Sequence, residues 1–199
     1  MTSTKTEQMR AIRDAIVNLT DSPLYEYRTE NSYYPVIGQG DHNAKIVFIG
    51  EAPGENEAKT GRPFCGASGR VLDELLASVG IDRETVYVTN IVKDRPPKNR
   101  DPRKDEIALY APFLDQQIDI IKPEVIATLG RFSMEFILKR FDAPQKTEKI
   151  SKLHGTLIKA QASYGEVSIL PLYHPAVALY NASQKSTLMD DFQQLKAFM

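Results

Sequence analysis

Four short apolar runs are the strongest structural signal in the chain. They cover residues 45–49, 85–92, 124–129 and 167–172. A continuous apolar run of this length is typical of a strand that is buried on both faces, as in a parallel sheet. We therefore predict four buried strands at these places.

Apolar residues that recur every three or four positions predict amphipathic helices around these strands. The predicted helices cover residues 5–19, 67–79, 103–121, 131–139 and 184–197. Because strands and helices alternate, the expected fold is α/β, a three-layer α/β/α arrangement with a central four-stranded, mostly parallel sheet. We expect one domain over residues 1–199.

The segments between these elements give three further expectations. Residues 20–44 form a polar connection, and residues 145–152 are poor in apolar side chains and predict a mobile loop. Asp101 and Pro102 stand directly before the predicted helix 103–121, where an acidic residue followed by proline is typical of a helix start.

Polar residues of kinds that commonly bind ligands or take part in catalysis stand at the carboxyl ends of three predicted strands. Residues 50–57 follow the first strand, Asn90 lies at the end of the second, and residues 173–175 follow the fourth. Ligands of open α/β sheets bind outside the carboxyl ends of the strands. We therefore expect these three places to converge on one crevice.

Composition limits the classes of function. The net charge is −1 with a pI of about 6.3, so any site for an anion has to be a local patch. The single cysteine, Cys65, excludes an internal disulfide and a cysteine-only metal site, and we interpret it as a small apolar residue. No apolar run has the length of a signal peptide core or a membrane span, so we expect a cytoplasmic protein with no membrane partner.

Four motifs, in this order and spacing, resemble the uracil-DNA glycosylase superfamily, most closely its family 4 branch. They are GEAPGENEAKTGRPFCGASGRVLDELL, VYVTNIVKDRPPKNRDP, APFLDQQIDIIKPEVIATLGRF and LPLYHPAVAL. The resemblance covers about residues 19–195. It implies a monofunctional DNA glycosylase of base excision repair, which hydrolyses the N-glycosidic bond of deoxyuridine and leaves an abasic site. The implied partner is uracil-containing DNA, single- or double-stranded, and the expected state is a monomer.

The resemblance assigns catalytic roles to three residues. Asn90 carries a donor and an acceptor that match the N3 and O4 edge of uracil and mismatch cytosine. His174, if neutral, is suited to donate a hydrogen bond to uracil O2 as negative charge develops there. The resemblance implies that Glu51 helps to place the water or the base. Of the other histidines, His42 and His154 are interpreted as structural or surface residues.

Further residues complete the expected uracil site. Phe64 resembles the aromatic that stacks on the base. Ala52 stands where family 1 enzymes have an aspartate, so that position offers no general base. Glu57 is expected to crowd the side where the methyl group of thymine would lie.

Two segments are expected to contact DNA. The proline-rich basic loop supplies Lys93, Arg95, Lys98 and Arg100, which would neutralise phosphates without reading sequence. Val177 and Leu179 are the candidates for a wedge that fills the gap left by a flipped base. Ala178 and Tyr180 stand where leucine and arginine are common, so we expect weaker activity on paired duplex than on single strands.

The chain departs from family 4 at its cofactor. Family 4 enzymes usually hold a [4Fe–4S] cluster on four cysteines, whose positions here are Leu19, Ser22, Asp94 and Tyr110. Such clusters need thiolate ligands, so we predict no cluster and no metal. We expect Asp94 to pair with a nearby arginine or lysine, and Tyr110 to pack as an aromatic.

Two other functions remain open from the sequence. One is a DNA-binding accessory protein that has kept the fold and lost the chemistry, favoured by the lost cysteines and the thinner wedge. The other is a glycosylase for a different deaminated base, such as hypoxanthine.

Overall fold

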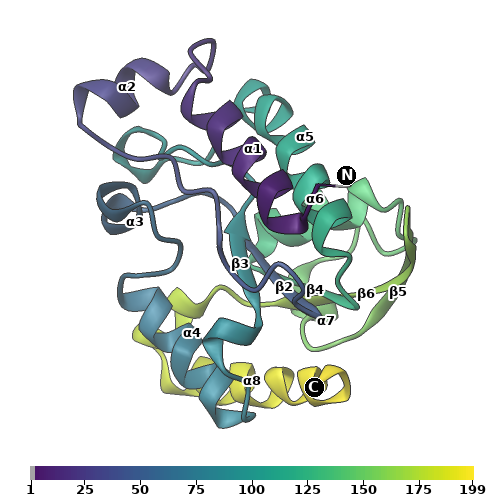
Figure 1. Cartoon of the computed structure of the whole chain (residues 1–199). Helices are drawn as coiled ribbons and strands as arrows, with labels where there is room; N and C mark the ends of the chain where they lie inside the picture. Colours follow the sequence, from purple (N-terminus) through teal and green to yellow (C-terminus); the bar gives the residue numbers. More distant parts are fainter. Residues whose placement is uncertain (1–2) are drawn as a thin grey trace.

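The computed structural model describes residues 3–199, and in these residues a twisted sheet separates two layers of helices (Figure 1). The helices are α1 (Lys5–Val17), α2 (Tyr25–Glu30), α3 (Glu55–Thr60), α4 (Ala67–Ser78), α5 (Lys104–Ile121), α6 (Arg131–Arg140), α7 (Ile150–Leu153) and α8 (Ala182–Phe192). The strands are β1 (Gln39–Gly40), β2 (Ile46–Gly50), β3 (Tyr87–Asn90), β4 (Val125–Leu129), β5 (Ile158–Ala162) and β6 (Gly165–Leu172). Short 3₁₀ turns include η2 (Pro97–Asn99) and η3 (Pro175–Leu179), and η4 (Gln193–Phe198) continues α8.

The sheet confirms the predicted α/β class and adds two strands. Its order is β1-β3-β2-β4-β6-β5, in which β3, β2, β4 and β6 are parallel and correspond to the four predicted strands. The edge strands β1 and β5 are antiparallel. They were missed because β1 has two residues and β5 alternates buried and exposed positions, so neither forms a continuous apolar run.

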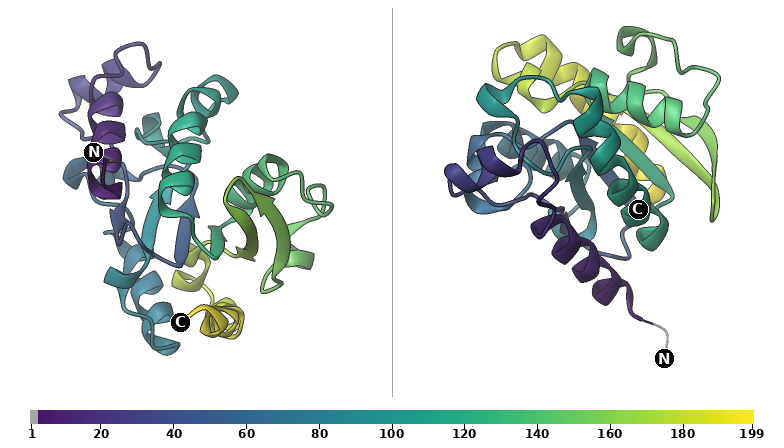
Figure 2. Two further views of the ribbon diagram at one scale, coloured as in Figure 1. Left: turned by 45° about the vertical axis from the view of Figure 1, so that its right-hand side comes forward. Right: turned by 90° about the horizontal axis from the view of Figure 1, so that it is seen from above.

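Alternate residues of each central strand point to opposite helical layers. Val47 and Ile49 of β2 pack in the cluster that includes α1, α5 and α6. Ile46 and Phe48 pack in the other cluster, with α4 and α8. Figures 1 and 2 show these two groups of helices on the two sides of the sheet. Burial on both faces explains why the strands consist of apolar runs.

Two boundaries differ from the sequence predictions. The helix α5 begins at Lys104 with Arg103 as its N-cap residue, whose backbone N–H donates to Glu106 at 2.8 Å. Asp101 therefore does not cap this helix. The predicted loop 145–152 ends in the short helix α7, which starts at Ile150 and buries Leu153.

A buried hydrogen-bond network joins the N-terminal segment to α5. The hydroxyl groups of Ser22 and Tyr110 lie 2.8 Å apart, and Tyr110 donates to Asp94 at 2.6 Å. Arg28 donates to both carboxylate oxygens of Asp94 at 3.2 Å and to the carbonyls of Ile16 and Val17 at the end of α1. The expected pairing of Asp94 with a nearby arginine is thus confirmed, and Tyr110 contributes a hydrogen bond as well as packing.

We predict that Arg28→Met lowers the free energy of unfolding by about 3–5 kcal/mol, because it leaves the carboxylate of Asp94 buried without its cation. Arg28 and Asp94 are 5% and 0% exposed. Urea unfolding of the purified variant measures the effect. The control is Arg13→Ala, which removes an exposed pair with Asp14 and should change the stability by less than about 1 kcal/mol. Equal effects of the two substitutions would contradict the prediction.

Candidate active site

A cavity of about 490 Å³ lies at the carboxyl ends of the parallel strands. Its lining contains the six residues predicted to bind the base, which come from the three strand ends and from the loop before α4. They are Glu51, Ala52, Glu57, Phe64, Asn90 and His174. The expected convergence of separate loops on one crevice is therefore found in the structure.

Gly50 lies against both the amide of Asn90, which is expected to recognise the base, and the ring of Phe64, which is expected to stack on it. It ends β2 and pairs with Asn90 at the end of β3. A Cβ added to Gly50 would lie 2.3 Å from Asn90 Oδ1 and 3.0 Å from the ring of Phe64. Only a residue without a side chain leaves room for both groups at this place.

The turn that carries Phe64 is held in an unusual conformation. Phe64 has a φ of +49°, which non-glycine residues rarely adopt and which is often found at functional sites. The carboxylate of Glu57 accepts hydrogen bonds from the backbone N–H groups of Cys65 and Gly66, each at 3.2 Å. Gly69 lets the carbonyl of Phe64 approach so closely that a Cβ there would lie 1.8 Å from it. Glu57 therefore has a structural role in this turn besides lining the cavity.

The hydrogen bonding of His174 fixes its neutral tautomer. The backbone N–H of Ala176 donates to His174 Nδ1 at 3.1 Å, so this nitrogen is an acceptor without a proton. The neutral ring then carries its proton on Nε2, where it can be donated to a ligand. Burial lowers the pKa of His174 below its usual value, against a raising effect of Glu57, which favours this neutral form. The rings of His174 and Phe64 lie 5.7 Å apart.

Glu51 has an acidity suited to proton transfer near neutral pH. Its pKa is raised to about 7, first by burial and then by repulsion from Asp101, against attraction from Arg131. Asp101 lines the same cavity. A carboxyl group with a pKa near the working pH is well placed to act as a general base.

Most of the predicted phosphate-binding cations are already engaged within the protein. Lys93 is 0% exposed, and the expectation that it contacts DNA is wrong for that reason. Arg95 is also buried and donates to Tyr33, Glu55 and Asn99. Arg100 pairs with Glu106 at the rim of the cavity. Lys98 is exposed, as a phosphate contact requires.

A groove of mixed charge adjoins the cavity and was missed by the sequence analysis. It has a volume of about 1000 Å³, shares Phe64 with the site, and is lined by three arginines and four carboxylates, which are Arg62, Arg70, Arg83, Asp41, Asp73, Asp82 and Glu84. Arg62 and Arg70 are exposed, whereas Arg83 pairs with Asp73. These arginines are scattered over a loop, a helix and a 3₁₀ turn, so they form no charge run that the sequence would reveal.

The predicted wedge residues lie on η3, directly after His174. Leu179 is 41% exposed, whereas Val177 packs partly against the hydrophobic cluster under α4 and α8. Tyr180 is 90% exposed. The exposed apolar surface of this turn therefore comes from Leu179 and Tyr180 rather than from Val177.

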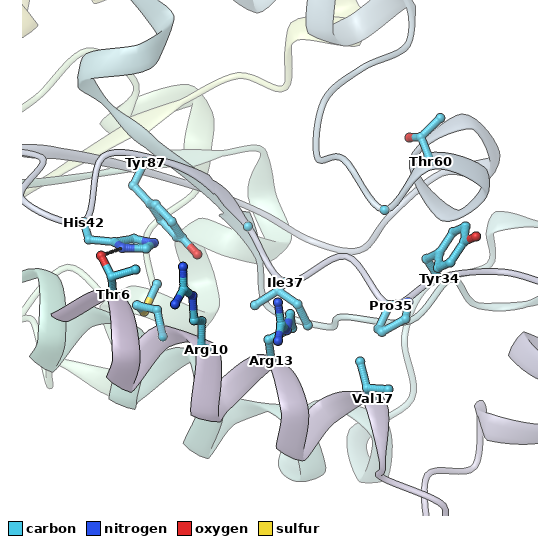
Figure 3. A pocket seen from close by; sticks show the side chains of 13 residues that line it. Thr6, Arg10, Arg13, Val17, Tyr34, Pro35, Ile37, His42, Thr60 and Tyr87 are labelled. Atoms are coloured by element: carbon cyan, nitrogen blue, oxygen red, sulfur yellow. Dashed lines mark hydrogen bonds between the residues drawn. The ribbon is translucent and has the colours of Figure 1, made fainter. Parts of the chain in front are cut away.

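The other two histidines lie outside the site. His154 Nδ1 lies 2.8 Å from Asp191, and its ring lies 4.7 Å from the ring of Tyr173 in a tilted arrangement. His42 contacts the hydroxyl of Thr6. It lies at the edge of another cavity, distinct from the groove with the arginines, which has a volume of about 550 Å³ and lies between α1 and residues 34–38 (Figure 3). None of the predicted site residues lines this cavity.

Further cavity-lining residues were missed as site residues. They are Pro53, Gly54, Ser68, Pro96, Asn99, Asp101 and Ala176. Asp101 was interpreted as a helix cap, which is the common role of an aspartate before a helix-starting proline. The shift of the helix start to Lys104 frees its carboxylate to face the site.

A match to a family model decides the classification. Residues 37–195 match the model described as "Uracil DNA glycosylase superfamily". The chain belongs to the uracil-DNA glycosylase superfamily. Among curated relatives of this superfamily member, a "Type-4 uracil-DNA glycosylase" of Sulfurisphaera tokodaii is 40% identical over 191 residues, covering 96% of this chain and 84% of the relative. A protein of the same name from Thermotoga maritima is 38% identical over 198 residues, covering 98% and 97%.

A solved structure agrees at the level of the fold. A solution NMR structure of a Methanosarcina acetivorans protein has a TM-score of 0.50 to this glycosylase-superfamily chain. It is 11% identical and covers 82% of this chain and 97% of that protein. In residues 3–199, no helix has both the length and the apolar character needed to cross a membrane.

We predict that the rate of base release rises with pH through about 7 and then levels off, because only the carboxylate form of Glu51 can accept a proton from water. Glu51→Gln should lower the plateau rate and flatten this limb. Single-turnover rates between pH 5 and 9 provide the measurement. A wild-type profile that is flat from pH 5 to 8 would show that Glu51 is not the base.

Proposed function

We propose that this protein is a uracil-DNA glycosylase that hydrolyses the N-glycosidic bond of deoxyuridine in DNA and leaves an abasic site. The observation that carries the proposal is the convergence of the Asn90 amide, the Phe64 ring and the His174 imidazole on one cavity. The similarity to Type-4 enzymes over almost the whole chain supports it. The protein acts in the cytoplasm as a one-domain monomer.

Asn90 and Phe64 select and hold the extruded base. The amide of Asn90 is 2% exposed, so a base that mismatches it leaves buried polar groups unpaired, at about 1–3 kcal/mol per group. Stacking on Phe64 supplies about 1–3 kcal/mol, which is comparable with the few kcal/mol needed to flip a base out of a duplex. Glu57 and the turn it holds close the side of the cavity against a larger pyrimidine.

His174 acts on the negative charge that develops on uracil in the transition state, and Glu51 acts on the water that attacks the positively charged sugar. Cleavage of the C–N bond leaves its electron pair on the departing uracil, and the N–H at Nε2 of His174 stabilises this negative charge at O2. Positive charge develops on the sugar, and Glu51 accepts a proton from the water that attacks it. The new C–O bond gives the abasic sugar, and uracil leaves as its anion, which takes up a proton from solvent, while Glu51 releases its proton to solvent.

The chemistry is hydrolysis without cleavage of the strand. Lys93, three residues after Asn90, directs its ammonium to Thr89, Gln117 and the Asn90 carbonyl and does not line the cavity. It therefore does not serve as a nucleophile toward the sugar.

DNA contacts come from the surface around the cavity. The exposed cations Lys98, Arg62 and Arg70 and the half-buried Arg100 flank it on two sides and can neutralise phosphates. Leu179 and Tyr180 supply the wedge. Because Ala178 next to them is small, the wedge fills the gap in a duplex poorly.

The enzyme works without an iron–sulfur cluster. Three of the four positions that hold cysteines in family 4 are Ser22, Asp94 and Tyr110, and their side chains are buried and hydrogen-bonded to one another. The fourth, Leu19, is apolar and packs against the core. Oxygen donors already engaged with Arg28 and with one another do not fit a cluster that requires thiolates. Across residues 3–199, no group of three or more His, Cys, Asp or Glu side chains could hold a metal ion.

We predict that protein produced in iron-rich medium contains less than about 0.1 iron per chain and keeps full activity after dialysis against a chelator, because thiolate ligands are missing. Elemental analysis and the visible absorbance spectrum test this. A chain loaded with four irons would refute it.

We predict that the enzyme releases uracil from oligonucleotides and leaves hypoxanthine in place, because Asn90 is aligned to a pyrimidine edge in a small cavity. His174→Ala should reduce the single-turnover rate by about 10²–10³-fold, as for loss of a preorganised oxyanion donor. Release of hypoxanthine in preference to uracil would identify the other glycosylase function. Tight DNA binding without release of either base would identify the accessory protein.

We also predict faster excision from single-stranded DNA than from a U·A duplex, because the wedge is small. Ala178→Leu should raise the duplex rate about 5- to 30-fold, which corresponds to about 1–2 kcal/mol of added apolar contact, and leave the single-strand rate unchanged. Matched substrates of one sequence provide the comparison. Equal wild-type rates on the two substrates would show that the wedge is adequate.

A further inference from the structure

Lys93 is a fully buried lysine whose environment the reaction described above leaves unexplained. Its ammonium donates to Thr89 Oγ1 at 2.7 Å, to the backbone carbonyl of Asn90 at 2.7 Å and to Gln117 Oε1 at 2.6 Å. A lysine ammonium has three donors, and here three acceptors satisfy them. None of these partners is a carboxylate, so no negative charge offsets the burial. Burial lowers the pKa of Lys93 well below its usual value.

Two of the three acceptors, Gln117 and Thr89, make further hydrogen bonds that do not involve Lys93. Gln117 lies on α5 and donates to the carbonyl of Ile37 and to the hydroxyl of Tyr87. Thr89 donates to the same Ile37 carbonyl at 2.7 Å. Ile37 and Tyr87 also line the cavity beside α1 (Figure 3). The ammonium is therefore anchored on a rigid frame between α5 and the strand β3.

The third acceptor is the backbone carbonyl of Asn90, the residue proposed to recognise the base. The Asn90 carbonyl is the last of β3, where the chain leaves the sheet and turns toward the basic loop. The backbone N–H of Ile91 is bonded to Gly50 at 3.0 Å, so the peptide that follows Asn90 is held at both its carbonyl and its N–H. The Asn90 side chain has little freedom to correct a shift of this peptide, because Oδ1 already lies against Gly50.

We propose that Lys93 is a positioning residue for uracil recognition, which fixes the backbone of Asn90 so that its amide meets the edge of the base. This inference rests on the proposed function and adds a residue that does not touch the substrate. A displacement of about 1 Å in a catalytic group can reduce the rate about 10²-fold, so a hydrogen bond to the carrier peptide is sufficient to matter.

The test is a double-mutant cycle between Lys93→Met and Asn90→Ala, measured on single-stranded uracil DNA. Lys93→Met alone should lower the single-turnover rate about 10- to 100-fold and raise the inhibition constant of free uracil. In the Asn90→Ala background, which keeps the backbone carbonyl but removes the amide, Lys93→Met should have almost no further effect. Binding of DNA that contains an abasic site should stay within about twofold of wild type, because the Asn90 amide has no base to contact there.

Thr89→Val is the matched control. It removes one of the two frame acceptors of the ammonium and keeps the shape of the strand residue. Lys93 stays anchored on Gln117 and bonded to the Asn90 carbonyl. It should retain uracil inhibition within about threefold of wild type at a temperature well below its melting point. If Lys93→Met does not fold, Lys93→Gln takes its place in the cycle.

The results separate this inference from the proposed function. A wild-type protein that does not release uracil refutes the proposed function itself. If wild type is active but Lys93→Met reduces the rate equally with and without the Asn90 amide, Lys93 is only a structural residue. The same conclusion follows if Thr89→Val weakens uracil inhibition as much as Lys93→Met does.

Discussion

The parallel pairing of Gly50 with Asn90 is the constraint on which the site depends. It places the ends of two neighbouring strands side by side, so that the loops that follow them leave the sheet at one point. Because Gly50 has no side chain, the Asn90 amide and the Phe64 ring both approach its Cα. A shift of one residue in this register would turn the Asn90 side chain to the other face of the sheet, away from the ring.

In the proposal that the enzyme works without a cluster, a second part of the molecule uses hydrogen bonds as its cross-link. A metal cluster would join four points of the chain through bonds to a single centre. Here Arg28, Asp94, Tyr110 and Ser22 join the end of α1, the loop after β3 and the start of α5 by hydrogen bonds between buried groups. Such a network is strong only while every member is paired, so its stabilising effect depends on the whole set.

An element or site residue could be predicted from the sequence where a short local pattern of residues determines it. The central strands are buried on both faces, so their apolar runs were visible in the sequence. The edge strands β1 and β5 depend on pairing with distant strands, which no local pattern shows. Within the site, the motifs identified Asn90, Phe64 and His174 as residues that belong together. The burial of Lys93 and Arg95 could not be predicted, because a charge run resembles a solvated loop until its partners from residues 33, 55 and 117 are known.

Burial shifts the pKa values of the two titratable groups of the proposed reaction in opposite directions. Burial favours the neutral form of each, which raises the pKa of Glu51 to about 7 and lowers the pKa of His174. The reaction requires Glu51 as a carboxylate and His174 as a neutral donor, and both forms coexist at any pH above the pKa of Glu51. The repulsion between Asp101 and Glu51 moves the lower end of this range upward, whereas Arg131 moves it downward. Burial is therefore the main cause that brings the pKa of Glu51 near neutral pH, the charges of Asp101 and Arg131 adjust that pKa in opposite directions, and burial also keeps the imidazole of His174 in its donating form.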